Sequence, residues 1–199
     1  MQAQALVLAP GFDDPVHESQ SVFRAAMTAL SRPGMIVPLH VDLLPPTMLT
    51  PTAAALALTL VDFETKLYLG AGLDDADDVQ RYLSFHTGAT MTAAPGHADF
   101  ALVADIEALP PLGVFAQGNL EYPDRSTTVI VQVQGFDHSL HFEGPGIDGR
   151  IAFGISGAPA RLAVDLEDNR ARFPLGVDLV FAAPHAIAAL PRSSRLVKV

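Results

Sequence analysis

Short apolar stretches alternate with segments of helical character along the whole chain, and this alternation restricts the possible folds more than any other feature. DFALVAD at 99–105, TTVIVQVQ at 127–134 and VDLVFA at 177–182 are rich in aliphatic and aromatic residues, a pattern typical of strands in a covered sheet. TKLYLG at 65–70 adds a strand of alternating pattern. Strands interleaved with helices in this way predict an α/β fold.

The first helix is expected to begin at Asp14 and Pro15, because aspartate is a favoured N-cap residue and proline fits the first helical turn. An apolar stripe at helical spacing follows: Phe23, Ala26, Met27 and Leu30. A stripe of this kind usually faces a core. The helix is expected to end at Arg32-Pro33-Gly34, since proline can neither donate a backbone hydrogen bond nor continue the turn.

Two further helices are predicted in the first half of the chain. Thr52–Leu60 is rich in alanine and leucine. A later helix runs through Val79 and ends at Gly88, a typical residue after a helix C-terminus. Four aspartates within 74–78 precede it, and negative charge there complements the positive end of the helix dipole. Binding of a cation by these carboxylates is the alternative.

The second half predicts an antiparallel pair of strands. TTVIVQVQ and HSLHFEG at 138–144 flank Gly135-Phe136-Asp137, which we interpret as a three-residue hairpin loop. A loop and a helix up to Asn169 follow, and MIVPLHV at 35–41 is expected near a sheet edge because it contains proline. The prediction is one domain over 1–199 with a three-layer α/β/α fold and a mixed sheet. Residues 1–11 are expected to form a flexible or extended arm.

Composition excludes several classes of function. The 199 residues carry a net charge of −10, which disfavours a nucleic-acid partner. There is no cysteine, so disulfides, thiolate metal sites and a cysteine nucleophile are excluded. Lys66 and Lys198 are the only lysines, and neither has the setting of a Schiff-base residue. No apolar run is long enough to span a membrane, and no export signal is evident, so a cytoplasmic protein is expected.

Motifs for catalysis or cofactor binding are weak throughout. Gly70-Ala71-Gly72 follows a strand, but the third glycine of a dinucleotide loop is replaced by Asp75. Gly154-Ile155-Ser156-Gly157 resembles a nucleophile elbow only loosely, and a turn at a helix start is favoured. No histidine or carboxylate spacing indicates a strong metal site. We therefore assign no catalytic, cofactor-binding or metal-ligating residue and expect no cofactor.

Gly144-Pro145-Gly146, directly after a predicted strand, has two interpretations. The glycine N–H groups could hold an anion, as backbone nests do. Pro145, however, removes one donor, and Glu143 and Asp148 have the wrong sign for phosphate. A rigid bend that shapes a dimer or partner surface is favoured, because proline fixes φ and glycine accepts left-handed angles.

Arginines stand beside other stiff corners of the same kind. Arg32, Arg172 and Arg192 are the candidates for contact with a phosphate or with a carboxylate of a partner. The alternative is that each is an ordinary surface arginine whose stem covers apolar area.

The turn motifs together resemble one family over nearly the whole chain. In chain order they are Arg32-Pro33-Gly34, Leu60–Thr65, Phe85-His86-Thr87-Gly88, Asp99-Phe100, Tyr122-Pro123-Asp124, Gly144-Pro145-Gly146-Ile147, Phe173-Pro174-Leu175-Gly176-Val177-Asp178 and Leu190-Pro191-Arg192. This series resembles the PhnH family, subunits of the bacterial carbon–phosphorus lyase core complex. Ser193-Ser194 and Asp124 depart mildly from the family, which tends to have a threonine pair and a glutamate there.

The resemblance implies several further expectations. The fold would be similar to the large domain of pyridoxal-phosphate transferases, without the cofactor. The chain would be a homodimer in isolation and would join PhnG-, PhnI- and PhnJ-like subunits. That assembly attaches a phosphonate such as methylphosphonate to the ribose C1 of ATP and releases adenine. The resemblance favours a scaffold role in it. A nucleotide- or phosphonate-binding or catalytic role is the alternative, and whether the chain is itself an enzyme stays open.

Overall fold

The computed structural model describes residues 8–197, which contain four α-helices, two short 3-10 helices and ten strands in two sheets. The helices are α1 (Pro15–Ser31), α2 (Pro51–Leu60), α3 (Asp77–Thr87), α4 (Arg161–Ala171), η1 (Pro95–His97) and η2 (Leu112–Val114). The strands are β1 (Val37–Pro38), β2 (Lys66–Leu69), β3 (Thr90–Met91), β4 (Phe100–Val103), β5 (Thr128–Gln132), β6 (Phe136–Glu143), β7 (Ile151–Ile155), β8 (Asp178–Ala183), β9 (Ala186–Leu190) and β10 (Arg195–Val197). No helix in this part of the chain is long and apolar enough to cross a membrane.

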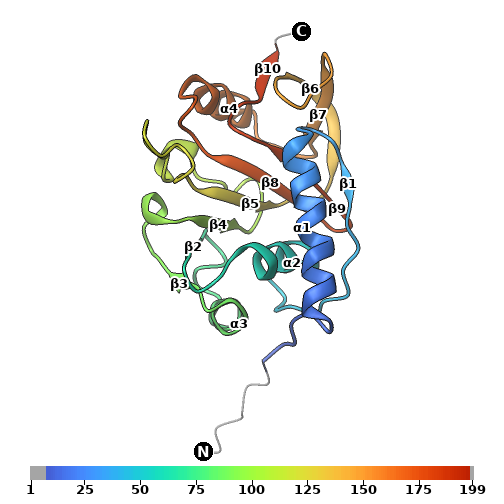
Figure 1. The fold of residues 1–199 in the computed structure, drawn as a ribbon, viewed down its shortest axis with the longest axis vertical. Helices are drawn as coiled ribbons and strands as arrows, with labels where there is room; N and C mark the ends of the chain where they lie inside the picture. Colours follow the sequence, from blue (N-terminus) through green and yellow to red (C-terminus); the bar gives the residue numbers. More distant parts are fainter. Residues whose placement is uncertain (1–7, 198–199) are drawn as a thin grey trace, which may run out of the picture.

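The larger sheet has seven strands in the order β1-β9-β8-β5-β4-β2-β3 (Figure 1). The five strands from β8 to β3 are mutually parallel, and β9 and β1 continue the sheet in antiparallel pairing. The predicted mixed sheet is therefore confirmed, and the proline-containing β1 lies at its edge as expected. Pro38 fits this place because an edge strand has one side on which no backbone donor is needed.

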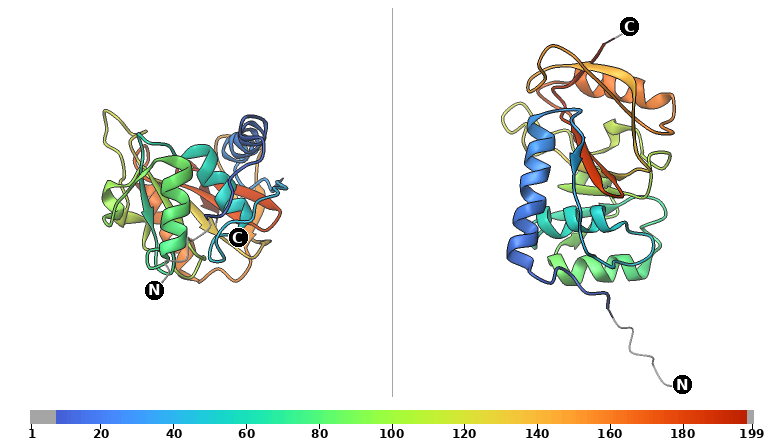
Figure 2. Two further views of the ribbon diagram at one scale, coloured as in Figure 1. Left: turned by 90° about the horizontal axis from the view of Figure 1, so that it is seen from below. Right: turned by 90° about the vertical axis from the view of Figure 1, so that its right-hand side faces the viewer.

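Both faces of the large sheet are covered (Figure 2). On one face α1, α2 and α3 bury sheet residues such as Ile130 and Val180. On the other face α4 packs together with a three-stranded sheet in the order β10-β6-β7 and buries residues such as Val131 and Phe181. The second outer layer is thus part helix and part sheet, whereas the sequence had predicted helices alone.

The helix ends follow the predicted capping. The side chain of Asp14 accepts a hydrogen bond of 3.2 Å from the N–H of His17, and Pro15 begins α1. Gly88 ends α3 with φ of 73°, an angle at which any side chain is strained. Asp77 and Asp78 lie in the first turn of α3, as a favourable charge at a helix N-terminus requires.

The apolar stripe predicted on α1 is only partly correct. The residues of α1 that are buried are Val22, Ala26 and Ala29, whereas Phe23 is 49% exposed and Met27 47% exposed. The buried face is turned from the predicted stripe because the helix packs closely on α2 and β9 through alanines. The larger side chains lie on its flank.

The predicted hairpin between β5 and β6 is wrong. Phe136 and Asp137 belong to β6, and β6 pairs with β7 and β10 in the small sheet. The physical reason is that β5 is central in the large sheet, with β4 on one side and β8 on the other, so both of its edges are occupied. Three strands in the second half were not predicted: β7, β9 and β10.

The part of the predicted N-terminal arm that the structure describes is irregular but packed. Leu8 and Ala9 lie against the helical core, and the Pro10 carbonyl accepts a hydrogen bond of 3.3 Å from the hydroxyl of Tyr82 on α3. Residues 1–7 of the arm lie outside the described residues.

Gln132, at the carboxyl end of β5, is a buried polar side chain that closes this end of the sheet. Its Oε1 accepts from the N–H of Thr50 at 2.6 Å, and its Nε2 donates to the carbonyls of Met48 and Ala104 at 3.1 and 3.0 Å. The connection that leads into α2 is thereby fastened across the carboxyl ends of β4 and β5.

Candidate functional site

Ligands usually bind at the carboxyl ends of the parallel strands in open α/β sheets. Beside the carboxyl ends of β2 and β3 lies a cavity of about 280 Å³, whose lining includes Leu69, Asp74, Gln80 and Thr92. The exposed carboxylate of Asp74 gives it a negative wall, with three more aspartates close by in sequence. Such a wall repels phosphate, in agreement with the rejection of a dinucleotide loop at Gly70-Ala71-Gly72.

The same aspartates were the alternative candidates for cation binding. Asp77 and Asp78 instead start α3, and the carboxylate of Asp74 accepts from the N–H of Gly72 at 3.1 Å. Within residues 8–197 no group of three or more histidines and carboxylates is placed to hold a metal ion. The helix-start interpretation is therefore the one that the geometry supports.

Three of the predicted corners meet at one end of the molecule. A Cβ on Gly146 would lie 2.2 Å from the carbonyl oxygen of Ser31, at the end of α1. A Cβ on Gly144 would lie 3.0 Å from the carbonyl oxygen of Ser193, in the turn after Pro191. The loop from Gly144 is closed by a 3.1 Å bond from the N–H of Ile147 to the Gly144 carbonyl. Gly144-Pro145-Gly146 is thus a tight turn wedged between two other corners.

Gly34 connects this cluster of three turns to both sheets. Its N–H donates to the carbonyl of Ala189 in β9 at 3.0 Å, and its φ is 77°. A Cβ there would lie 3.0 Å from the Ile151 side chain of β7. The buried corner of Pro33 and Gly34 therefore joins α1, the large sheet and the small sheet.

Two arginines flank Glu143 beside this junction. Arg150 donates to Glu143 at 3.0 Å, and Arg195 contacts the other carboxylate oxygen. The hydrogen bond from Arg150, together with the nearby charge of Arg195, lowers the pKa of Glu143 below its usual value. The negative charge of Glu143 was one reason against anion binding at the Gly144-Pro145-Gly146 turn. That charge is thus balanced by Arg195 on β10 and by Arg150 in the β6–β7 connection.

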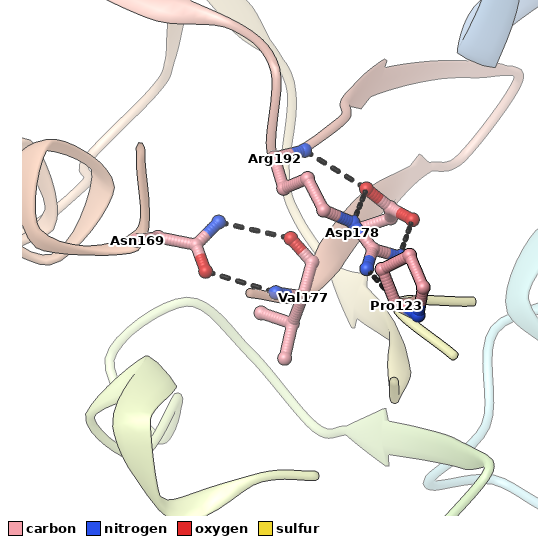
Figure 3. Close-up of polar contacts among 5 residues, drawn as sticks. All are labelled: Pro123, Asn169, Val177, Asp178 and Arg192. Atoms are coloured by element: carbon pink, nitrogen blue, oxygen red, sulfur yellow. Dashed lines mark hydrogen bonds and ion pairs between the residues drawn. The ribbon is translucent and has the colours of Figure 1, made fainter. Parts of the chain in front are cut away.

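Arg192 is engaged within the protein (Figure 3). Its guanidinium makes a two-point contact with the carboxylate of Asp178, through Nε to Oδ1 at 3.1 Å and through Nη2 to Oδ2 at 2.5 Å. Its backbone N–H also donates to Asp178, and Nη1 donates to the carbonyl of Pro123. The side chain of Arg192 is only 13% exposed. The arginine therefore fastens the turn after β9 to the start of β8 and to the loop before β5.

Asn169 makes a second clamp next to it (Figure 3). The buried side chain accepts from the N–H of Val177 and donates to the carbonyl of the same residue, both at 2.9 Å. Gly176 lies against it, with φ of 118° and room for no Cβ, which would lie 2.7 Å from the Asn169 amide oxygen. This arrangement explains the glycine in the Phe173–Asp178 motif, where the Phe173–Pro174 peptide bond is cis.

Replacing Asn169 with alanine should lower the free energy of unfolding by about 2–3 kcal/mol, because both backbone groups of Val177 lose their buried partner. Alanine at the neighbouring exposed Asp168 is the matched control and should change it by less than about 0.5 kcal/mol. Urea denaturation of the three proteins measures both values. Equal stabilities of the two variants would contradict the clamp.

Arg172 and Arg32 have different surroundings from Arg192. Arg172 is exposed and donates to the side-chain oxygen of Gln117 at 3.0 Å. It also borders a cavity of about 310 Å³ that Asp165 and Asp168 line as well, so an anion there would meet carboxylates. Arg32 is exposed, and its guanidinium makes no hydrogen bond within residues 8–197. The three candidate arginines thus have different partners and surroundings.

His86 and Gly88 position neighbouring segments at the other end of the molecule. The Nε2 atom of His86 lies 3.0 Å from the carbonyl oxygen of Ala9, and its ring packs on those of Tyr82 and Phe85. A Cβ on Gly88 would lie 3.1 Å from the side chain of Phe63. These contacts give His86 a structural role, since it holds the segment at Ala9 against α3.

Sequence reasoning missed three polar residues that organise the site: Gln117, Asn169 and Gln132. Gln117 contacts Arg172 and Gln132 contacts Thr50, both far along the chain, whereas Asn169 bonds to Val177, eight residues on. No local pattern reveals these contacts. One signal was available for the loop before β5. Gly118-Asn119 is a dipeptide typical of turns, and it precedes the Tyr122-Pro123-Asp124 motif.

Comparison with known proteins gives consistent matches over nearly the full chain. The family model "Bacterial phosphonate metabolism protein (PhnH)" matches residues 10–197. The chain is 39% identical over 198 residues to "Alpha-D-ribose 1-methylphosphonate 5-triphosphate synthase subunit PhnH" of Rhizobium meliloti (strain 1021), covering 98% of both chains. It is 32% identical over 183 residues to "Putative C-P lyase subunit protein HtxG" of Stutzerimonas stutzeri, covering 89% of this chain and 85% of the relative.

Proposed function

Because the chain belongs to the PhnH family of bacterial phosphonate metabolism proteins, we propose that it is a subunit of the assembly for which its Rhizobium meliloti relative is named. That assembly would transfer a phosphonate such as methylphosphonate to the ribose C1 of ATP. An oxygen of the phosphonate forms the new bond to C1, adenine leaves, and the 5′-triphosphate is retained. The near-complete overlap with two relatives named as subunits carries this proposal.

Within the assembly we propose a scaffold role for this chain. Two of the three candidate arginines already have partners, Asp178 for Arg192 and Gln117 for Arg172. The glycine and proline corners support the same role, because they lock α1, the two sheets and the loop before β5 into one rigid body. A rigid body with a shaped surface is suited to holding other subunits.

One observation favours the alternative, a subunit that itself binds a nucleotide or phosphonate. Arg32 is exposed beside the Gly144-Pro145-Gly146 turn, and Arg150 and Arg195 lie next to that turn around Glu143. Calorimetric titration with ATP and with methylphosphonate decides between the roles. Binding to the isolated chain that is lost in Arg32→Ala would favour the alternative over the scaffold.

We propose homodimer formation in isolation and assembly with PhnG-, PhnI- and PhnJ-like subunits in the cytoplasm. The flank of α1 supports a self-association surface, since Val16, Phe23 and Met27 are all exposed there. Co-purification with the three partner subunits tests the assembly. Sedimentation of the isolated chain tests the dimer, which a monomer at micromolar concentration would contradict.

We further propose that the large sheet keeps the frame of the large domain of pyridoxal-phosphate transferases without their cofactor. The mixed sheet with α1, α2 and α3 on one face is compatible with that relationship. Lys66 lies exposed at the start of β2 and not in a desolvated pocket where a Schiff-base lysine would be activated. Absence of absorbance change on titration with pyridoxal phosphate is the expected result.

A further inference from the structure

We propose that the loop Gly118–Arg125, called here the Leu120 loop, docks this chain onto a neighbouring subunit. The partner surface would offer an apolar socket for Leu120 within a positively charged rim. The inference rests on the proposed function, because it requires an assembly of several subunits. Four features of the loop carry it: its exposed tip, its fixed conformation, its anchoring and its charge.

Leu120 is the most exposed large apolar side chain among residues 8–197, at 81%. The connection between β4 and β5 that contains it projects from the body on the side away from α1 (Figures 1 and 2). Tyr122, two residues further on, is 40% exposed. Aromatic residues such as tyrosine are enriched in interfaces, and neighbouring exposed apolar side chains often mark an interaction site.

The tip is held in one conformation by its own backbone. The side-chain oxygen of Asn119 accepts from the N–H groups of Glu121 and Tyr122 at 3.0 and 2.7 Å. The N–H groups of Asn119 and Arg125 both donate to the Tyr122 carbonyl at 3.2 Å. The orientation of Leu120 is thus fixed by bonds on both sides of it.

The sides and base of the loop are equally fixed. Gly118 has φ of 74°, and a Cβ on it would lie 2.6 Å from the carbonyl oxygen of Pro123, so the two limbs are in close contact. The guanidinium of Arg125 lies 4.2 Å from the centre of the Tyr122 ring. At the base, Gln117 pairs with Ser126, and Arg192 donates to the Pro123 carbonyl.

The Leu120 loop is held rigid although its side chains are not buried. Leu120, Glu121, Tyr122 and Asp124 are all exposed, so fixing them adds little apolar area to either core. A loop that is ordered before binding loses less conformational freedom when a partner covers it. The fixed, exposed conformation therefore benefits an interface more than it benefits the fold.

Charge indicates the kind of partner. The exposed carboxylates of Glu121 and Asp124 flank the apolar tip, and the only basic group of the loop, Arg125, is stacked on Tyr122. The whole chain carries a net charge of −10. A second copy would bring like charges together, whereas a positively charged subunit is attracted and correctly oriented. We therefore assign the socket to a different subunit of the assembly.

The test compares assembly of the chain with PhnG-, PhnI- and PhnJ-like subunits for the wild type, Leu120→Asp and the control Leu44→Asp. Leu44 is 77% exposed and lies in the connection before α2, so its variant matches in chemistry and exposure. Leu120→Asp should weaken assembly about tenfold or more, as loss of a central apolar anchor does, while Leu44→Asp assembles normally. Both variants should unfold at the wild-type temperature, and added salt should weaken wild-type assembly.

Each other outcome overturns the inference. If Leu120→Asp assembles as well as Leu44→Asp, the loop is not the docking element, although the proposed function stands. If the wild type does not assemble, the inference and the proposed function both fall. If Leu120→Asp turns an isolated dimer into a monomer, the socket belongs to a second copy. If it lowers the unfolding temperature, Leu120 is a structural residue.

Discussion

Replacing Arg192 with alanine is expected to lower the free energy of unfolding by about 3 kcal/mol, because Asp178 would keep a largely buried carboxylate without its cation. The arginine side chain is 13% exposed and the aspartate side chain 22%, so solvent can compensate only in part. The Pro123 carbonyl loses its partner as well. Amide hydrogen exchange in the Leu120 loop should therefore become faster.

Urea denaturation measures the Arg192→Ala effect, with Arg192→Lys as the matched variant. Lysine keeps the charge but cannot make the two-point contact of the guanidinium, so an intermediate loss of about 1–2 kcal/mol is expected. A loss below about 1 kcal/mol for the alanine variant would contradict a structural role for this ion pair. The result also bears on ligand tests, since lost binding in Arg192→Ala can reflect lost structure.

Gly146→Ala is expected to have a comparable or larger effect, a loss of about 2–5 kcal/mol in the free energy of unfolding. Its φ of 83° lies in the left-handed region, which costs an alanine about 1–2 kcal/mol. The new Cβ would also lie 2.2 Å from the Ser31 carbonyl oxygen, so the end of α1 or the turn must move. Overpacking against backbone in a close contact costs a further ~1–3 kcal/mol.

Gly149→Ala separates these two contributions. Gly149 has φ of 69° in the same loop, but no heavy atom lies within 4 Å of a Cβ built on it. This variant should therefore lose only the backbone contribution of about 1–2 kcal/mol. Denaturant unfolding of both variants gives the difference, and equal losses would show that the Gly146 contact relaxes without penalty.

The sequence predicted those elements whose signals are local. The runs around Ala101, Ile130 and Val180 form strands that are covered on both faces, and such strands have nearly continuous apolar sequences. Asp14, Pro15 and Gly88 mark helix ends because capping acts within a few residues. Neither signal depends on the rest of the chain.

Pairing partners were not predictable in the same way. The adjacency of β5 and β6 in sequence indicated a hairpin, but β5 lies between β4 and β8, which are far from β6 in sequence. The flank and the buried face of α1 are both apolar, so periodicity could not tell Phe23 from Val22. Which of these two sides of α1 is buried depends on where α2 and the sheet pack against the helix.

The sequence predicted which turns form the candidate site, but it did not predict which of these turns contact one another. Glycine and proline show in the sequence where the chain must bend, and Gly34, Gly144 and Gly146 do bend there. Which corners touch follows only from the fold, as does the pairing of Arg192 with Asp178. A surface arginine and a paired arginine have the same sequence signature when the partner lies 14 residues away.

The pairing of β1 with β9 has a consequence for biosynthesis. The edge strand made early, at Val37 and Pro38, finds its partner at 186–187, and α1 packs against that same late strand. A nascent chain that has not yet released β8 and β9 from the ribosome leaves α1 with α2 but without the sheet surface that it covers, and leaves β5 with an open side. Productive folding of this protein therefore waits until β9 has been synthesised, and chains that end before β9 should be substrates for chaperones and proteases.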